Sequence, residues 1–238
     1  PAVKYSWDNR NKPISDEEEI EAWTKFTFPG RKGKYNDYVW TWKNFSGVDY
    51  DDRTNDHALF NFAQKGWEDQ VDDEMGNYDY LMGCDLDMEN PETIEQLDKW
   101  GKWYQELTNV DGYRLDAVKH IEFNYYVNWL LNRREEKGKD LFVVGEYWSG
   151  DLPKLEEYLD SSGNLIHLFD VPLHYNFYEA SHSNGAYDMS QIFAGTLTAS
   201  REDYAVTFVD NHDTQVGQSL QSWVDGLSLI HISEPTRH

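Results

Sequence analysis

Short apolar runs recur along the second half of the chain. Residues 141–144 (LFVV), 166–169 (IHLF) and 205–209 (AVTFV) have the length and the apolar content of buried strands. Segments with a helical spacing of apolar residues lie between these runs. Strands and helices that alternate at this pitch predict parallel βαβ units.

The clearest helical pattern follows Asp116. Phe123, Tyr126, Val127 and Leu130 fall on one face of such a helix. Gly138 can adopt the left-handed conformation that ends many helices. We therefore expect a helix that ends near residue 138.

Residues 1–90 have a different texture. They are rich in Trp, Tyr, Asp, Asn and Gly and show little sustained helical periodicity. This composition predicts a loop-rich, irregular β region, and the change of pattern sets its boundary near residue 90.

Composition and charge narrow the function further. The chain has 238 residues, 39% of them apolar, and its 21 basic and 44 acidic side chains give a formal charge of −23. This charge would repel phosphate backbones and anionic lipid, so we expect no nucleic-acid and no membrane partner. Ten Trp and 16 Tyr offer flat apolar faces on which sugar rings can stack.

The single cysteine, Cys84, excludes an intrachain disulfide and leans the assignment towards a cytoplasmic protein. A signal peptide upstream of Pro1 is an open alternative. The sequence therefore does not determine the compartment.

Three carboxylates follow three of the predicted strands. Asp116 comes directly after residues 110–115, Glu146 ends the run that begins at residue 141, and Asp213 follows the run that begins at residue 205. An acid after a strand can be a helix N-cap. Three acids at equivalent places favour a catalytic site, because the C-terminal strand ends of a (β/α) barrel converge on one face.

Two carboxyl groups are what glycoside hydrolysis requires, one as an acid and the other as a nucleophile or base. Arg114 lies two residues before Asp116 on the same strand face, where its charge would keep Asp116 ionised. Glu146 has no cation adjacent in sequence and is flanked by a glycine and two aromatic residues. Such surroundings raise a carboxyl pKa towards that of a general acid.

Three segments resemble, in the same order, signature segments of the α-amylases of glycoside hydrolase family 13. They are residues 111–120 (DGYRLDAVKH), 144–148 (VGEYW) and 208–215 (FVDNHDTQ). The resemblance implies an endo-acting, retaining hydrolase of α-1,4-glucosidic bonds in starch, glycogen and related α-glucans. It also implies a (β/α)8 barrel.

The same resemblance implies roles for single residues. Asp116 would be the nucleophile, Glu146 the acid/base, and Asp213 the acid that orients the sugar hydroxyls and stabilises the transition state. The implied substrate-binding residues are Arg114, Lys119, His120, Tyr147, Trp148 and His212.

The similarity extends from about residue 5 to about residue 225. Residues 28–31 (FPGR) and 76–82 (GNYDYLM) resemble the excursion called domain B in liquefying bacterial α-amylases and their intracellular relatives. We therefore expect an α/β protein, in which residues 1–90 form most of an irregular β-rich domain B and residues 91–225 form about strands 4 to 7 of a partial TIM (β/α)8 barrel.

Expectations about the ends of the chain follow from this alignment. The remaining barrel strands fall outside these residues, so we expect the 238-residue polypeptide alone to be neither stably folded nor active, and the complete enzyme to be a monomer. We expect residues 226–238 to be a non-native tail. From Leu227 they look like translated sequencing-adapter read-through, and the alternative is a divergent or naturally shortened tail.

Calcium (Ca2+) is the metal that the resemblance implies. Asp79 and Asp85 match family positions that bind a structural calcium, and the backbone carbonyl of His120 matches a third. Hard oxygen ligands of this kind suit Ca2+. Fewer cations are expected than in the secreted liquefying enzymes, because three positions that hold aspartates there are occupied here by Ser46, Glu68 and Glu89.

Two other functions stay open at this point. One is another family 13 activity, an exo-acting α-glucosidase or a transglycosylase, and the other is a non-catalytic glucan-binding homologue. The Tyr147 and Trp148 pair after the acid and the type of domain B favour endo-hydrolysis. The presence of all three carboxylates together with Arg114 favours an enzyme.

Overall fold

The computed structural model describes residues 1–226, and the predicted tail of residues 227–238 lies outside the described residues. The chain forms two compact units. The first comprises residues 1–110 and 119–140, and the second comprises residues 111–118 and 141–226. This division groups residues 91–110 and 119–140 with the N-terminal region. The domain boundary near residue 90 stays a prediction.

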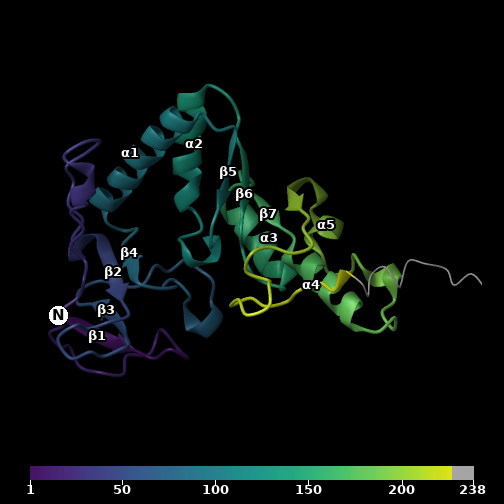
Figure 1. The fold of residues 1–238 in the computed structure, drawn as a ribbon, viewed down its shortest axis with the longest axis horizontal. Coiled ribbons are helices and arrows are strands. Elements are labelled where there is room, and N and C mark those ends of the chain that lie inside the picture. The colour runs from purple at the N-terminus through teal and green to yellow at the C-terminus, as the bar shows by residue number, and fades with distance from the viewer. Residues whose placement is uncertain (227–238) are drawn as a thin grey trace, which may run out of the picture. The chain divides into compact units, whose positions relative to one another are not determined.

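An antiparallel sheet is the centre of the first unit (Figure 1). Its strand order is β1-β3-β2-β4, and the strands are joined by long irregular segments that contain isolated bridges such as that between Phe26 and Trp40. The bounds are β1 (Ala2–Tyr5), β2 (Phe45–Val48), β3 (Leu59–Phe62) and β4 (Cys84–Leu86). The sequence therefore predicted the irregular β character of this region correctly.

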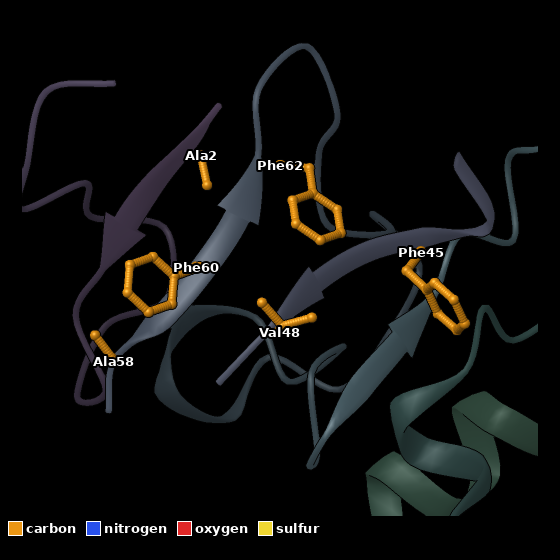
Figure 2. Close-up of a cluster of buried hydrophobic side chains, with 6 residues drawn as sticks. All are labelled: Ala2, Phe45, Val48, Ala58, Phe60 and Phe62. Atoms are coloured by element: carbon orange, nitrogen blue, oxygen red, sulfur yellow. The ribbon is translucent and has the colours of Figure 1, made fainter. Parts of the chain in front are cut away.

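Alternate side chains of these strands form the hydrophobic core of the sheet. Phe60 and Phe62 lie two residues apart on β3, so they project to the same face. Figure 2 shows the cluster of six buried side chains, Ala2, Phe45, Val48, Ala58, Phe60 and Phe62.

Two helices complete the first unit. Helix α1 (Pro91–Thr108) begins where Oδ1 of Asn90 accepts a hydrogen bond from the Glu92 N–H, at 2.9 Å. Helix α2 (Tyr125–Lys137) ends at Gly138, whose φ of 68° is left-handed, as the sequence predicted. Phe123, which was also predicted on this helix, precedes it because its N–H bonds to the Gln70 carbonyl.

A parallel sheet is the centre of the second unit (Figure 1). The four strands lie in chain order and are β5 (Gly112–Leu115), β6 (Phe142–Gly145), β7 (His167–Phe169) and β8 (Ala205–Val206). The intervening helices of this unit are α3 (Leu152–Ser161), α4 (Val171–His182) and α5 (Leu197–Ser200). The predicted βα alternation is confirmed, and it is the repeating pattern of a (β/α) barrel.

Strand β8 is shorter than the apolar run at 205–209 predicted. It pairs only through Ala205 with Leu168 and through Val206 with Phe169. Its partner β7 stops at Phe169, because the next residue, Asp170, caps helix α4 through the Leu173 N–H. Within residues 1–226, no strand pairs with the residues after Val206, and these residues form a loop.

In the described part of the chain, six short 3-10 helices connect these elements: Pro29–Arg31, Trp42–Asn44, Glu74–Gly76, Val118–His120, Met189–Gln191 and Glu202–Tyr204. Among the described residues, no helix combines the length and the apolar content needed to cross a bilayer.

Candidate active site

Main-chain pairing brings two of the predicted catalytic carboxylates together. Strands β5 and β6 are parallel, with Leu115 opposite Gly145 as their last pair. Asp116 is therefore the first residue after β5, and Glu146 is the first residue after β6. The Glu146 N–H donates to the Leu115 carbonyl at 2.8 Å, which continues the pairing into the site.

Arg114 contacts both carboxylates. Its Nη1 lies 2.6 Å from Oδ1 of Asp116, and its Nη2 lies 3.0 Å from Oε2 of Glu146. The planar guanidinium can donate in two directions at once. Arg114 thereby holds the two acids at one point on the C-terminal edge of the sheet.

The two carboxylates have different surroundings. The side chain of Asp116 is 73% exposed, whereas that of Glu146 is 8% exposed. Burial raises the pKa of Glu146, although the charge of Arg114 opposes this shift. Its Oε1 is buried without a hydrogen-bond partner among the described residues. A protonated acid beside an ionised carboxylate is the division that glycoside hydrolysis uses.

Ala117 adopts an uncommon backbone conformation between these acids. Its φ of 51° is left-handed, which costs a residue with a Cβ atom about 1–2 kcal/mol. In this conformation its N–H points towards Oε2 of Glu146, at 3.4 Å. The strain falls at the predicted catalytic position, where such conformations often have a role.

Asp213 lies in the loop that follows β8. Oδ1 of Asn211 accepts hydrogen bonds from the N–H groups of Asp213 and Thr214, at 2.8 Å and 3.0 Å. Nε2 of His212 lies 3.0 Å from Oδ2 of Asp213. The Asp213 side chain is 30% exposed and that of His212 is 66% exposed, so both are accessible to a ligand.

The two aromatic residues after Glu146 point to different places. Tyr147 is 1% exposed and packs against Tyr158 of α3, with ring centroids 5.4 Å apart. This burial does not fit the predicted contact of Tyr147 with a sugar. Trp148 is partly exposed and donates from Nε1 to the Tyr175 hydroxyl at 3.0 Å.

Lys119 and His120 belong to the first unit, where Tyr78 contacts both. Lys119 is ion-paired with Glu74 at 2.8 Å, and its Nζ lies 4.9 Å from the centre of the Tyr78 ring. Nδ1 of His120 lies 2.7 Å from the Tyr78 carbonyl oxygen, and burial lowers the pKa of His120 to about 4. His120 is thus an uncharged hydrogen-bonding group at neutral pH.

The first unit also contains a cluster of acidic side chains. Carboxylate oxygens of Glu68, Asp79 and Asp85 all lie within 4.8 Å of one another. Asp79 and Asp85 were predicted as metal ligands. From the sequence, Glu68 is only a position at which the secreted liquefying enzymes have an aspartate. It was not predicted as a ligand, because its proximity to Asp79 and Asp85 arises from the tertiary structure.

The chemistry of this cluster fits a cation. Burial and the neighbouring negative charges raise the pKa of Asp79, and burial raises that of Asp85. Oε2 of Glu68 is buried and has no hydrogen-bond partner within residues 1–226. Several carboxylates in one buried place repel one another unless a positive charge lies between them, so these residues have the donor set of a hard metal ion.

Known α-amylases resemble the chain over nearly all of its length. An α-amylase from Geobacillus stearothermophilus is 50% identical over 226 residues, which are 94% of this chain and 41% of that protein. The α-amylase of Bacillus licheniformis is 46% identical over 94% of this chain and 44% of its own length. The cytoplasmic α-amylase of Escherichia coli K12 is 45% identical over 92% of this chain and 45% of its own length.

The parallel βα units and the carboxylate pair at their C-terminal edge resemble the framework of a (β/α)-type glycoside hydrolase. With identities of 45–50% to curated α-amylases, the chain belongs to the α-amylase family, glycoside hydrolase family 13. It matches no protein-family model. It spans less than half the length of these three relatives.

Proposed function

We propose that this chain provides the catalytic carboxylates of an endo-acting, retaining hydrolase of α-1,4-glucosidic bonds in α-glucans. One observation carries the proposal. A single guanidinium, that of Arg114, binds the exposed Asp116 and the buried Glu146. Two carboxylates on one small group lie close together, and retaining glycosidases have such a short separation.

The proposed reaction has two steps. Asp116 attacks the anomeric carbon and forms a glycosyl ester while Glu146 protonates the departing glycosidic oxygen. Glu146 then removes a proton from water, the water attacks the same carbon, and the ester bond to Asp116 breaks. The raised pKa of Glu146 supports the role of acid in the first step.

Two further residues assist this reaction in the proposal. Asp213 binds sugar hydroxyls and strengthens that interaction as positive charge develops on the ring, and His212 beside it contacts the sugar. The accessible side chains of both residues support these roles. Trp148 offers an aromatic face close by in sequence to Glu146.

We also propose that Ca2+ binds at the acidic cluster through Asp79 and Asp85, with Glu68 as an additional ligand. The backbone carbonyl of His120 is the fourth proposed ligand. The unpartnered Glu68 oxygen and the close approach of the three carboxylates support this site. The ion would neutralise the cluster and so stabilise the first unit.

The activity can be tested in a chimera in which this chain replaces the segment that it matches in the Geobacillus α-amylase. The chimera should hydrolyse soluble starch, and the viscosity should fall well before most reducing ends appear, because internal bonds are cut first. Proton NMR of the first product should show the α-anomer. A β-anomer, or a cooperatively folded chimera with no hydrolysis, would contradict the proposal.

A further inference from the structure

A buried histidine lies between the two loops of the second unit that carry Glu146 and Asp213. His174 of α4 is fully buried. Its ring stacks on Phe208 with centroids 5.0 Å apart and an angle of 9°. The indole of Trp148 packs against the same imidazole at 5.6 Å. His174 therefore contacts the segment after β6 and the segment after β8.

Both ring nitrogens of His174 hold the loop that contains Asp213. Nδ1 lies 2.5 Å from the carbonyl oxygen of Val209, and Nε2 lies 2.8 Å from Oγ of Ser222. Val209 and Ser222 bracket residues 210–221. Two hydrogen bonds from one rigid ring thus fix the two ends of this loop.

The chemistry of the partners determines the proton on His174. A carbonyl oxygen can only accept, so Nδ1 carries the hydrogen that is donated to Val209. Burial lowers the pKa of His174 and favours the uncharged ring, whose Nε2 is an acceptor. The Ser222 hydroxyl can donate to this Nε2 or to the Leu220 carbonyl oxygen, which lies 2.8 Å from Oγ.

A short chain of contacts links this clamp to Asp213. The Ser222 N–H donates to the Thr214 carbonyl at 3.0 Å, and Thr214 is the residue after Asp213. Oγ1 of Thr214 donates to Oδ1 of Asp210 at 3.1 Å. Together with the Asn211 side chain, these bonds leave Asp213 few alternative orientations.

We propose that His174 is a positioning residue that fixes Asp213 in its orientation towards the substrate. The expected effect of His174 on catalysis rests on the proposed function. Its expected effect on the loop does not. Since a displacement of about 1 Å can cost a catalytic group about 100-fold in rate, loss of the clamp should lower kcat more than it raises KM.

The test uses substitutions in the same chimera that separate the parts of the ring. His174→Phe keeps the flat ring and removes both hydrogen bonds. His174→Asn keeps an amide nitrogen near Nδ1, and His174→Gln keeps a polar group near Nε2. We expect a fall in kcat of about 10- to 100-fold for His174→Phe, partial recovery in the Asn or Gln variant, and KM within about 2-fold.

His182→Phe is the matched control, because His182 lies on the same helix with an exposed side chain. It should leave kcat unchanged. Ser222→Ala removes one clamp contact without altering the buried ring, and it should also lower kcat. This second variant decides the question if His174→Phe abolishes cooperative unfolding.

Amide hydrogen exchange gives a readout that does not depend on activity. Peptides covering residues 209–222 should exchange faster in His174→Phe and Ser222→Ala, whereas peptides covering 141–145 should not change. If Ser222→Ala had the same kcat and the same exchange rates as the wild-type chimera, the inference would be overturned and the proposed function would stay intact. An inactive wild-type chimera would overturn the proposed function, and the exchange rates would still decide whether His174 holds the loop.

Discussion

Nη2 of Arg114 lies 3.0 Å from Oε2 of Glu146, in addition to the contact of Arg114 with Asp116. The parallel register of β5 and β6 places Arg114 opposite Val144, two residues before Glu146. One cation therefore acts on both members of the carboxylate pair. Burial and the nearby Asp116 raise the pKa of Glu146, and the charge of Arg114 opposes this shift.

Removal of the Arg114 charge should shift the pH dependence of the enzyme. Arg114 lowers the pKa of Glu146, so Arg114→Gln should raise that pKa further and keep the acid protonated to higher pH. The alkaline limb of kcat/KM should move to higher pH while the maximal rate falls, since Asp116 loses its partner. Arg114→Lys, which retains the charge, is the control. A limb that moves to lower pH in Arg114→Gln would contradict the assignment of Glu146 as the acid.

Two substrates should distinguish the nucleophile from the acid. Asp116→Asn, Glu146→Gln and Asp213→Asn should each lower turnover of starch by about 10²–10⁴-fold or more, with the fold intact. An α-maltosyl fluoride needs no protonation of its leaving group. The first turnover should therefore release fluoride at a largely retained rate in Glu146→Gln, whereas later turnovers slow because hydrolysis of the glycosyl ester lacks its base. Asp116→Asn should release no fluoride even in the first turnover.

An exposed acid provides the control for this comparison. Asp203 lies just before β8 and is exposed, so Asp203→Asn should keep normal turnover of both substrates. Normal turnover of starch by any of the three catalytic variants would show that the role given to that residue is wrong.

Chelation should destabilise the chimera through the acidic cluster. A ligand that binds only the native state at 100 times its Kd stabilises it by about 2.7 kcal/mol. The melting temperature should thus fall when EGTA replaces Ca2+, and Asp79→Asn or Glu68→Gln should reduce this difference. Asp69→Asn, a substitution at an exposed acid next to Glu68, should leave the difference unchanged. If the differences in melting temperature were equal in Asp79→Asn and Asp69→Asn, the metal site would be wrongly placed.

Gly101 should resist substitution by alanine even though it lies within a helix. Alanine is preferred over glycine in a helix interior by about 1 kcal/mol. A Cβ atom at Gly101 would, however, lie 2.7 Å from Cζ2 of Trp129 and collide with the guanidinium of Arg133. Arg133 is fully buried and bonds to the Asp98 carbonyl at 2.8 Å, so it cannot move away freely.

We therefore expect Gly101→Ala to destabilise the protein by about 1–3 kcal/mol in urea unfolding. Lys102→Ala, at an exposed position on the same helix, should change stability by less than about 0.5 kcal/mol. An increase in stability for Gly101→Ala would mean that α1 and α2 do not pack this closely.

Local patterns were enough to predict many elements. The stop of α2 at Gly138 was predictable because a left-handed residue after a helix is a local property. The strand at 205–209 was predicted too long because its length depends on β7, a partner that is distant in sequence. Tyr147 was predicted to contact a sugar from its place in a motif, but its ring packs against Tyr158, a contact made only when α3 folds back onto the sheet.

The amino-acid sequence by itself determined the family and the alternation of strands and helices, because these depend on residue types and short spacings. It also predicted the three catalytic acids. The tertiary structure decided which groups act on each acid. The register of β5 and β6 put Arg114 against Glu146, chain folding brought Glu68 to Asp79 and Asp85, and His174 came to lie under the loop of Asp213. Interactions of this kind join residues far apart in the chain, and their energies depend on burial and distance, which exist only in the folded protein.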